Sequence, residues 1–588
     1  MGSFKNFYYI IRKLNFKRHF YFFFLICFIS ALIEVISIGS ILPLVSLVTD
    51  DNFLKSYPRI YEFLINFSPI NFFSFDQTNQ AKALVSICFY TFLIFLVRFF
   101  FQIFTEWVKA KFIYRLEYTM ANKLFSNIMK APYLFHLNSN SSNFHRDIQS
   151  NIGFFSATAN AITVVLIEIL IIFGLASLAL KINFAVTISI IFTVLIFGFL
   201  FLYFTKKINL SLGKDVHESS QLRVKNLIEG LGGIKEILVF NKMNNFINQF
   251  KQSNLRLTSA KKYNSVIGSL PRYIIEIILV CILVITLLII SLSKDPIINN
   301  LTLLGFFSAT FIRLTPSAYR IVSSLQRVKF TEKILDSLYK NLIYFNKLNL
   351  EKNHQDKKIE NELIEIKDMI RIKNLDFSYN SKNKIFHNLN LEIKIGDTIG
   401  IFGESGTGKS SFVNLLIGLL KPDKGEILIN DKDINSNITS WRKNIGYVPQ
   451  NIFLIDDTFK KNISFEIENN TEDLEKLNEC LKQSELAKFI NNLQDGVETI
   501  VGERGSRISG GQLQRVGIAR ALYNNPKILI FDESTSALDQ ETELEILKNI
   551  YKFKNKKTLI IITHKKELLS ECNKIYKLEN GKFLENEK

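Results

Sequence analysis

Residues 398–411 read Thr398-Ile399-Gly400-Ile401-Phe402-Gly403-Glu404-Ser405-Gly406-Thr407-Gly408-Lys409-Ser410-Ser411. The first five residues are an apolar run typical of a buried strand, and a helical run, 411–420, follows the loop. The loop fits the pattern GxxxxGK[ST], whose glycines let backbone N–H groups converge on phosphate oxygens at the start of a helix. We therefore expect residues 403–411 to bind nucleotide phosphates, with Lys409 on the β- and γ-phosphates and Ser410 on Mg²⁺.

A pair of acidic residues follows further along the chain. Residues 527–533 read Lys-Ile-Leu-Ile-Phe-Asp-Glu, a buried-strand pattern that ends in Asp532 and Glu533. We expect Asp532 to hold Mg²⁺ through water and Glu533 to polarise the attacking water as general base. The two motifs together predict hydrolysis of a nucleoside triphosphate.

Between these motifs stands Ile508-Ser509-Gly510-Gly511-Gln512. A Ser-Gly-Gly turn at the start of a helix is a second potential anion site. The pentapeptide resembles the signature motif of ABC transporters, in which Leu is usual at the position of Ile508. The resemblance implies that residues 509–512 contact the γ-phosphate of ATP that another subunit binds.

Further positions match motifs of the same family, so that the resemblance covers residues 370–588. It implies that Tyr379 stacks on adenine and that Gln450, in Tyr447-Val-Pro-Gln450, senses Mg²⁺ and the attacking water. It also implies that Asp539, in Ser536-Ala-Leu-Asp539, lies between two ATP sites and that His564 contacts the γ-phosphate. Residues 501–505, Val-Gly-Glu-Arg-Gly, resemble an exporter-type segment that contacts the membrane domain.

The first half of the chain consists of long apolar runs. About 20 apolar helical residues cross a bilayer core of about 30 Å. Six runs reach that length: 21–48, 83–108, 155–180, 184–204, 273–292 and 299–322. The predicted fold is thus a helical membrane domain with six spans, as in type IV ABC exporters, followed by an α/β phosphate-loop ATPase domain. The expected limits are 1–328 for the membrane domain, 329–366 for a linker and 367–588 for the ATPase domain.

The net charge of +18 raises nucleic-acid binding as a first hypothesis. Most of the excess, however, lies in segments 1–20, 109–152 and 206–270, which flank the apolar runs on one side. The positive-inside rule places that side in the cytoplasm. We therefore expect no nucleic acid as partner, but a multi-pass protein of the bacterial cytoplasmic membrane with both termini and the ATPase domain in the cytoplasm. Five cysteines without a CxxC pair exclude a disulfide scaffold and a zinc cluster.

One phosphate loop and one signature per chain imply, by the resemblance, a homodimer with two composite ATP sites. ATP and Mg²⁺ are the expected cofactors. The outer segment 50–82 carries apolar residues at helical spacing within 53–65, which fits either an amphipathic helix on the membrane or a packed loop cap.

Ionisable residues inside the spans point to the substrate, since charge in a membrane usually faces a cavity or a partner. Arginine suits phosphate oxygens, so an anionic substrate is one interpretation; structural salt bridges with Glu34, Glu168 and Glu276 are the other. The candidate substrate-binding residues are Arg98, Arg272, Arg313 and Arg320.

The membrane half also resembles bacterial flippases of lipid-linked oligosaccharides. The similarity rests on short stretches around Glu34, Pro271-Arg272 and residues 313–320, and on the outer segment. It implies ATP-driven movement of an undecaprenyl-pyrophosphate glycan from the cytoplasmic to the outer leaflet. An exporter of another lipid, a peptide or an amphipathic drug is the alternative, whereas six spans exclude a nucleic-acid-dependent cassette ATPase.

Overall fold

The structure is a computed structural model that describes residues 2–41, 43–44, 66, 79–182, 184–292, 297–356, 366–380, 383–465, 474–502, 505–533 and 540–586. The chain divides into two compact units. The helical unit comprises Met1–Ala131 and Ser139–Asn349, and the sheet unit comprises Pro132–Asn138 and Leu350–Lys588. A short segment of the first half, which contains helix α6 (Tyr133–Asn138), therefore belongs to the sheet unit.

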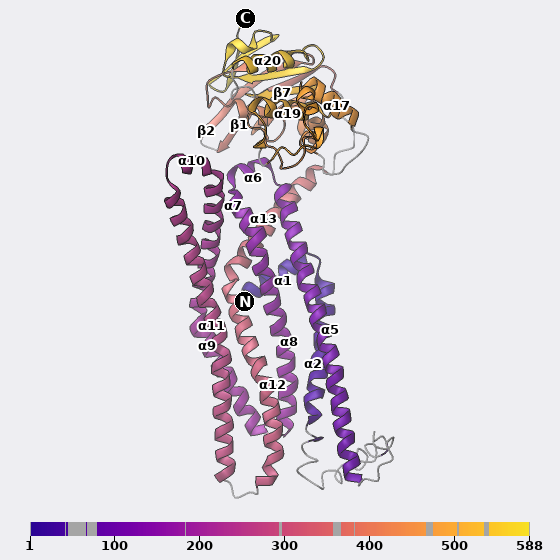
Figure 1. Cartoon of the computed structure of the whole chain (residues 1–588), viewed down its shortest axis with the longest axis vertical. Coiled ribbons are helices and arrows are strands. Elements are labelled where there is room, and N and C mark those ends of the chain that lie inside the picture. The colour runs from indigo at the N-terminus through magenta and orange to yellow at the C-terminus, as the bar shows by residue number, and fades with distance from the viewer. Residues whose placement is uncertain are drawn as a thin grey trace. The chain divides into compact units, whose positions relative to one another are not determined.

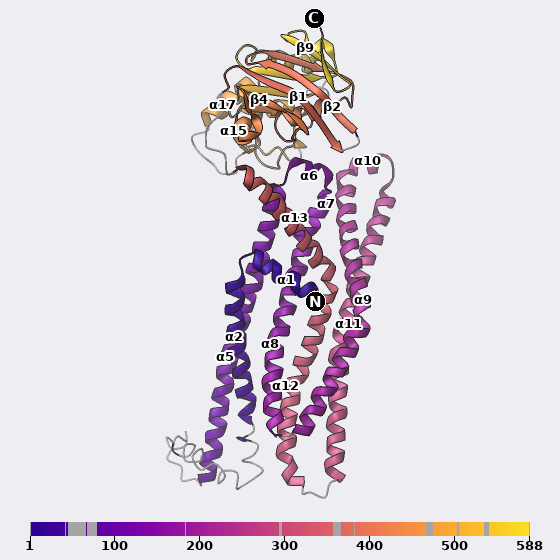
Figure 2. The same cartoon turned by 180° about the vertical axis from the view of Figure 1, so that it is seen from behind.

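Long helices build the helical unit (Figures 1 and 2). A short helix, α1, precedes them, and α9 and α11 lie side by side, as do α2 and α5. The elements are α1 (Gly2–Lys13), α2 (Lys17–Gly39), α5 (Asn79–Met129), α7 (Ser141–Arg146), a π-helical turn (Asp147–Asn151), α8 (Ile152–Ile182), α9 (Phe184–Gly232), α10 (Ile234–Val239), α11 (Met243–Leu292), α12 (Ile297–Phe330) and α13 (Glu332–Asp356).

A helix lies over each predicted span. Within the described residues, α2, α5, α8, α9 and α11 are long and apolar enough to cross a membrane. The sixth predicted span, 299–322, lies inside α12, where the side chains of residues 301–313 are outside the described part. The end of the first predicted span and nearly all of the outer segment 50–82 also lie outside it.

Close packing between the helices depends on aromatic and small residues. Phe23 of α2 stacks on Phe112 of α5, with ring centroids 5.5 Å apart. Gly213 of α9 faces the backbone carbonyl of Phe330, at the end of α12, so closely that a Cβ atom at this position would collide with it. The glycine therefore lets α9 approach the end of α12.

Two sheets form the core of the sheet unit. The antiparallel sheet has the order β2-β1-β4-β5, and the second sheet has the order β10-β9-β3-β8-β7-β6, in which all neighbours except β10 and β9 are parallel. The strands are β1 (Met369–Asn380), β2 (Asn383–Lys394), β3 (Thr398–Phe402), β4 (Lys424–Ile429), β5 (Lys432–Asp433), β6 (Ile445–Val448), β7 (Ile528–Asp532), β8 (Thr558–Thr563), β9 (Lys574–Glu579) and β10 (Lys582–Glu585).

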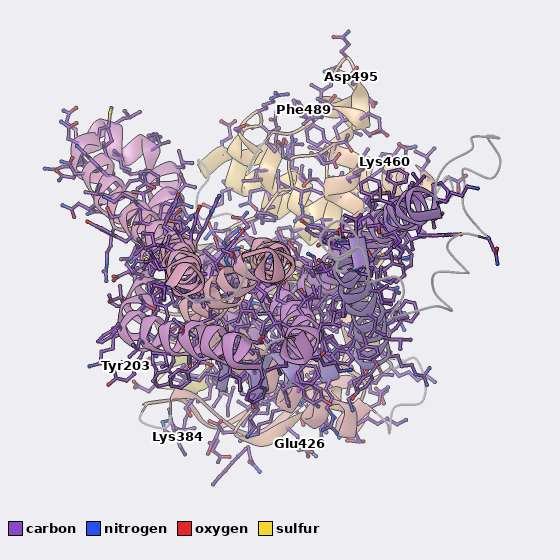
Figure 3. The ribbon with its side chains drawn as sticks, turned by 90° about the horizontal axis from the view of Figure 1, so that it is seen from below. Tyr203, Lys384, Glu426, Lys460, Phe489 and Asp495 are labelled. Carbon is purple, nitrogen blue, oxygen red and sulfur yellow. The ribbon has the colours of Figure 1, made fainter. Side chains whose placement is uncertain are left out.

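Helices complete the sheet unit, and their apolar faces fill its core. Figure 3 shows Lys384 of β2 and Glu426 of β4 on one side of this unit and Phe489 of α18 on the other. The helices are α14 (Lys409–Leu416), α15 (Ile438–Lys443), α16 (Phe459–Ser464), α17 (Leu474–Gln483), α18 (Ala487–Asn491), α19 (Gly510–Leu522) and α20 (Gln540–Tyr551). Strands β3, β7 and β8 are buried along nearly their whole length, as their apolar sequences predict.

Candidate functional site

The phosphate loop joins the carboxyl end of β3 to the start of α14. Gly406 and Gly408 have φ values of 84° and 103°, a left-handed backbone that glycine adopts without steric cost. A Cβ atom on Gly408 would lie 2.7 Å from Cγ2 of Ile385, so the loop also needs glycine for space. The ammonium of Lys409 is buried in this loop and donates to the carbonyl oxygens of Gly403 and Glu404, both at 2.9 Å.

Glu533 lies beside this lysine. Its Oε1 atom is 3.4 Å from Nζ of Lys409 and 2.7 Å from Nε2 of His564, and its Oε2 atom accepts a hydrogen bond of 2.8 Å from Nε2 of Gln450. Glu533 has a φ of 48°, which is uncommon for a non-glycine residue and characteristic of functional sites. The predicted catalytic residues Glu533, His564 and Gln450 thus converge next to the phosphate loop.

Strand order brings these side chains together. Strands β3, β8, β7 and β6 are consecutive neighbours in the parallel part of the sheet. The loop follows β3, His564 follows β8, Glu533 follows β7 and Gln450 follows β6 within two residues. Carboxyl ends of parallel strands share one edge, so the four motifs meet there although up to 161 positions separate them.

Asp532 is buried at the end of β7, and its environment suits a hard cation. Oδ2 accepts a hydrogen bond of 3.2 Å from the Tyr447 hydroxyl, whereas Oδ1 is buried and has no hydrogen-bond partner among the described residues. Burial is the main cause that raises the pKa of Asp532, with a smaller contribution from Glu533. A buried carboxylate with one unused oxygen fits Mg²⁺, which prefers oxygen ligands, and Ser410 offers a second, exposed oxygen at the start of α14.

Tyr447 remains a neutral phenol. Burial raises its pKa, and the negative charge of Asp532 raises it further, with a small contribution from Tyr133. The hydroxyl is therefore protonated and donates to Asp532. In the sequence, Tyr447 stands in the motif before Gln450 and had no predicted role; the available signal was a tyrosine at the end of a buried strand.

Of the other positions predicted to bind nucleotide, Tyr379 is described by the structure and Asp539 is not. The Tyr379 hydroxyl lies 3.1 Å from Oγ of Ser411, so this ring is close to the first turn of α14. The ring is 37% exposed and meets Phe377 edge to face. Asp539 and residues 503–504 lie outside the described part of the chain.

The signature motif forms the start of α19. Ser509 is the N-cap, and its side chain and that of Gln512 form a capping box. Ser509 and Gly510 are exposed, and within the described residues the hydrogen bonds of the Ser509 side chain stay inside the cap. The structure therefore does not join the signature to the phosphate loop of the same chain.

Two of the four arginines predicted to bind substrate form ion pairs. Arg98 of α5 lies 2.6 Å from Oε1 of Glu34 on α2, and Gln102 donates to Oε2 of the same glutamate at 2.9 Å. Glu34 is 1% exposed, so this polar group is deeply buried between the helices. Gln102 was not predicted, although it lies one helical turn after Arg98 on the same face.

Arg320 of α12 lies 2.9 Å from Oε1 of Glu168 on α8, and its side chain remains 38% exposed. The salt-bridge interpretation is thus observed for Glu34 and Glu168. Arg272 and Glu276 of α11 are exposed. The side chain of Arg313 is outside the described part.

Residues 386–536, which include the phosphate loop, Glu533 and the signature, match the family model described as ABC transporter. The chain is also similar in fold to a bacterial Atm1-family ABC exporter with ATP bound, with a TM-score of 0.68 and 20% identity over 95% of this chain and 94% of that one. The sheet unit therefore contains an ABC transporter domain. The predicted fold class, a helical membrane domain followed by an ABC ATPase domain, is confirmed.

Three proteins similar to this chain illustrate its relatives, and two of them have names that refer to export or translocation. A Rickettsia typhi protein named as an export ATP-binding/permease protein is 33% identical over 380 residues, 64% of each chain. The Bacillus subtilis ABC transporter ATP-binding protein YwjA is 28% identical over 79% of this chain and 80% of its own length. The Escherichia coli alpha-hemolysin translocation ATP-binding protein HlyB is 41% identical over 38% of this chain and 32% of its own. The chain thus spans less than two thirds of the first and third of these relatives.

Proposed function

We propose that this protein is an ABC exporter that hydrolyses ATP and uses the energy to export a substrate across the bacterial cytoplasmic membrane. The observation that carries the proposal is the meeting of Lys409, Glu533, His564 and Gln450 at one edge of a parallel sheet. In this arrangement a buried ammonium stands beside a carboxylate that an imidazole and an amide orient. Such a set suits phosphate binding and activation of water.

Each predicted site residue has a place in this function. The loop amides of residues 403–411 and Lys409 bind the phosphates, and Tyr379 stacks on the base. Ser410, Gln450 and Asp532 hold Mg²⁺, which, when bound, neutralises charge on the phosphates. Glu533 accepts a proton from the attacking water, and Gln450 and His564 orient Glu533.

The functional form in this proposal is a homodimer. Ser509 and Gly510 are exposed at the start of α19, and among the described residues the hydrogen bonds of the Ser509 side chain stay within the cap, as expected of a motif that completes the site of a second copy. Asp539 joins the two sites. In the helical unit, α10 and the residue after it present Leu238, Val239 and Phe240, which are 51–69% exposed, an apolar surface that a second copy would cover.

The proposed substrate is a polyprenyl-pyrophosphate-linked oligosaccharide that moves to the outer leaflet. Arg272 is exposed, and Arg320 is half-exposed although it pairs with Glu168. A pyrophosphate carries more charge than a carboxylate, so it competes with Glu168 for the guanidinium of Arg320. Arg98 pairs with a deeply buried glutamate and is less accessible.

A second candidate substrate is a polypeptide, and the name of HlyB, an alpha-hemolysin translocation protein, favours it. Another lipid or an amphipathic drug belongs to the same alternative. The proposed domain limits are the same for every candidate substrate: a membrane domain to residue 328, a linker of 329–366 and a cytoplasmic ATPase domain.

Purified protein in liposomes separates these substrates. We expect lipid-linked oligosaccharide to stimulate ATP hydrolysis and to appear in the opposite leaflet, and we expect the Glu533→Gln variant to show neither effect. The double variant Arg313→Ala/Arg320→Ala should keep basal hydrolysis but lose stimulation and transfer. Stimulation by a polypeptide but not by the lipid-linked glycan would instead select the second candidate, and unchanged transfer by the double variant would make both arginines structural.

A further inference from the structure

Tyr447 is the hydrogen-bond donor to the carboxylate of Asp532 in the described part of the chain. The phenol binds Oδ2 at 3.2 Å, while Oδ1 is buried without a partner among the same residues. A carboxylate held at one oxygen cannot rotate freely, so its second oxygen keeps a fixed direction. Outer hydrogen-bond partners of this kind orient the ligands of bound metals in many proteins.

The sheet sets the position of Tyr447. It lies on β6, which runs parallel to β7, and it pairs with Ile530, two residues before Asp532. Because side chains alternate between the two faces of a strand, Ile530 and Asp532 lie on the same face of β7. The Tyr447 side chain on the neighbouring strand is then long enough to reach the carboxylate at the strand end.

Tyr133 is a second tyrosine at the buried core of the sheet unit. Both rings pack against the same cluster of buried side chains in the sheet unit. Tyr133 is also the smallest of the causes that raise the pKa of Tyr447. Tyr133 belongs to α6, within the segment Pro132–Asn138. The chain enters this segment from α5 of the helical unit and leaves it toward α7 of the same unit.

The geometry points to Tyr447 as a positioning residue that holds Asp532 for Mg²⁺, and to Tyr133 as the residue of segment 132–138 that supports Tyr447. The inference rests on the proposed function as an ATPase and adds to it a contact path. The path leads from a segment whose two ends continue into membrane helices to the carboxylate that holds the metal. A displacement of α6 would thus change how firmly the site holds Mg²⁺.

The Tyr447→Phe variant tests the first step, because it removes the hydroxyl and keeps the ring. In the full-length protein, Mn²⁺ serves as a spectroscopic substitute for Mg²⁺, and electron paramagnetic resonance measures its binding in the presence of a non-hydrolysable ATP analogue. We expect Mn²⁺ to bind about ten-fold more weakly to the variant. Binding of a fluorescent ATP analogue in EDTA should stay within about two-fold of wild type, because the hydrogen bond acts on the metal ligand.

Tyr551→Phe is the matched control. The Tyr551 hydroxyl, in the same unit, donates to the carbonyl oxygen of Leu568 at 2.8 Å and lies 3.5 Å from Sγ of Cys572, and among the described residues it has no hydrogen bond to Asp532. This variant also loses the hydrogen bonds of a phenol, and its Mn²⁺ affinity should equal that of wild type. Equal Mn²⁺ affinity of Tyr447→Phe and wild type would overturn the inference while leaving ATP binding intact. A wild-type protein that binds no nucleotide would instead overturn the proposed function.

The role of Tyr133 is tested by a double-mutant cycle with the same Mn²⁺ measurement. Tyr133→Ala should weaken Mn²⁺ binding when Tyr447 is present, and it should add nothing in the Tyr447→Phe background. Tyr133→Phe, which keeps the packing ring, should retain most of the affinity. Additive effects, or no effect of Tyr133→Ala, would show that segment 132–138 does not act through Tyr447.

Discussion

The imidazole of His564 lies 2.7 Å from the Glu533 carboxylate, at the oxygen that also faces the Lys409 ammonium. Gln450 donates to the other oxygen. Glu533 is therefore held from both sides at the end of a buried strand. A carboxylate in such a fixed position can accept a proton from water without first searching for the right orientation.

Replacement of Glu533 by Gln tests its role as general base. The amide keeps the size of the side chain but cannot accept the proton, and general-base catalysis contributes about 10²- to 10⁴-fold. We expect ATPase activity, measured by phosphate release, to fall by about 10²- to 10⁴-fold. ATP binding, measured with a nucleotide analogue, should persist. Glu485→Gln, which removes a carboxylate paired with Lys552 at 2.8 Å, is the control and should retain activity. Activity near the wild-type rate in Glu533→Gln would refute the assignment.

The buried pair of Glu34 and Arg98 predicts a stability effect in the helical unit. Arg98→Ala leaves a buried carboxylate without its counter-charge, a change that costs about 3–5 kcal/mol in buried pairs. In detergent, the unfolding temperature should fall markedly for Arg98→Ala and less for the double variant Glu34→Gln/Arg98→Ala. Lys214→Ala, from an exposed pair with Glu218, should change little. Equal unfolding temperatures for Arg98→Ala and wild type would argue against the importance of the pair.

Gly213 is expected to tolerate no side chain. A methyl group there would meet the backbone carbonyl of Phe330, and backbone cannot move aside as a flexible side chain can. Gly213→Ala should therefore lower the free energy of unfolding by about 1–3 kcal/mol. The unfolding temperature and the yield of folded protein should fall with it. Gly230→Ala, in the same helix but with nothing within 4 Å of the added atom, should be neutral or slightly stabilising. The same loss in both variants would point to the helix rather than to this contact.

Asp532 gives a prediction that depends on pH. Because burial raises its pKa above 3.8, the ionised form destabilises the folded protein. This penalty is present at neutral pH and disappears as the pH falls through the raised pKa. Asp532→Asn should thus unfold at a higher temperature than wild type at pH 7 without Mg²⁺, and the difference should shrink in acid. Asp376 is the contrasting control, since a backbone N–H bond from Asn388 and Lys384 lower its pKa, so that Asp376→Asn should not stabilise.

Local patterns in the sequence were sufficient for the phosphate loop, the acidic strand end and the signature. Each motif is a short run beside an apolar strand or at the start of a helix. The local sequence therefore determines the local backbone, and the motif can be recognised without knowledge of distant segments. That β3, β8, β7 and β6 are neighbours is a property of strand pairing between distant segments. This order was not predicted, because no local pattern encodes the order of strands in a sheet. Only the roles that the family resemblance implied for Gln450 and His564 indicated that these motifs meet.

The helical unit was predictable as apolar spans but not in its side-chain pairing. Apolar composition identifies a span, whereas the face of α5 that meets α2 depends on packing. The pair of Arg98 and Glu34 joins positions 64 residues apart, and the sequence left open whether such arginines bind substrate or glutamates. Segment 132–138 lies within a basic stretch that was assigned to the cytoplasmic side, and nothing in its composition indicated that it folds with the sheet unit.

The division of the sheet unit between two parts of the chain has a consequence for biosynthesis. Segment Pro132–Asn138 leaves the ribosome before residues 139–349, and its packing partners follow only after them. At about 5–20 residues per second, α6 waits tens of seconds before the core that receives Tyr133 exists. The membrane helices on both sides of α6 can insert during that time, so docking of α6 closes the assembly of the chain rather than beginning it.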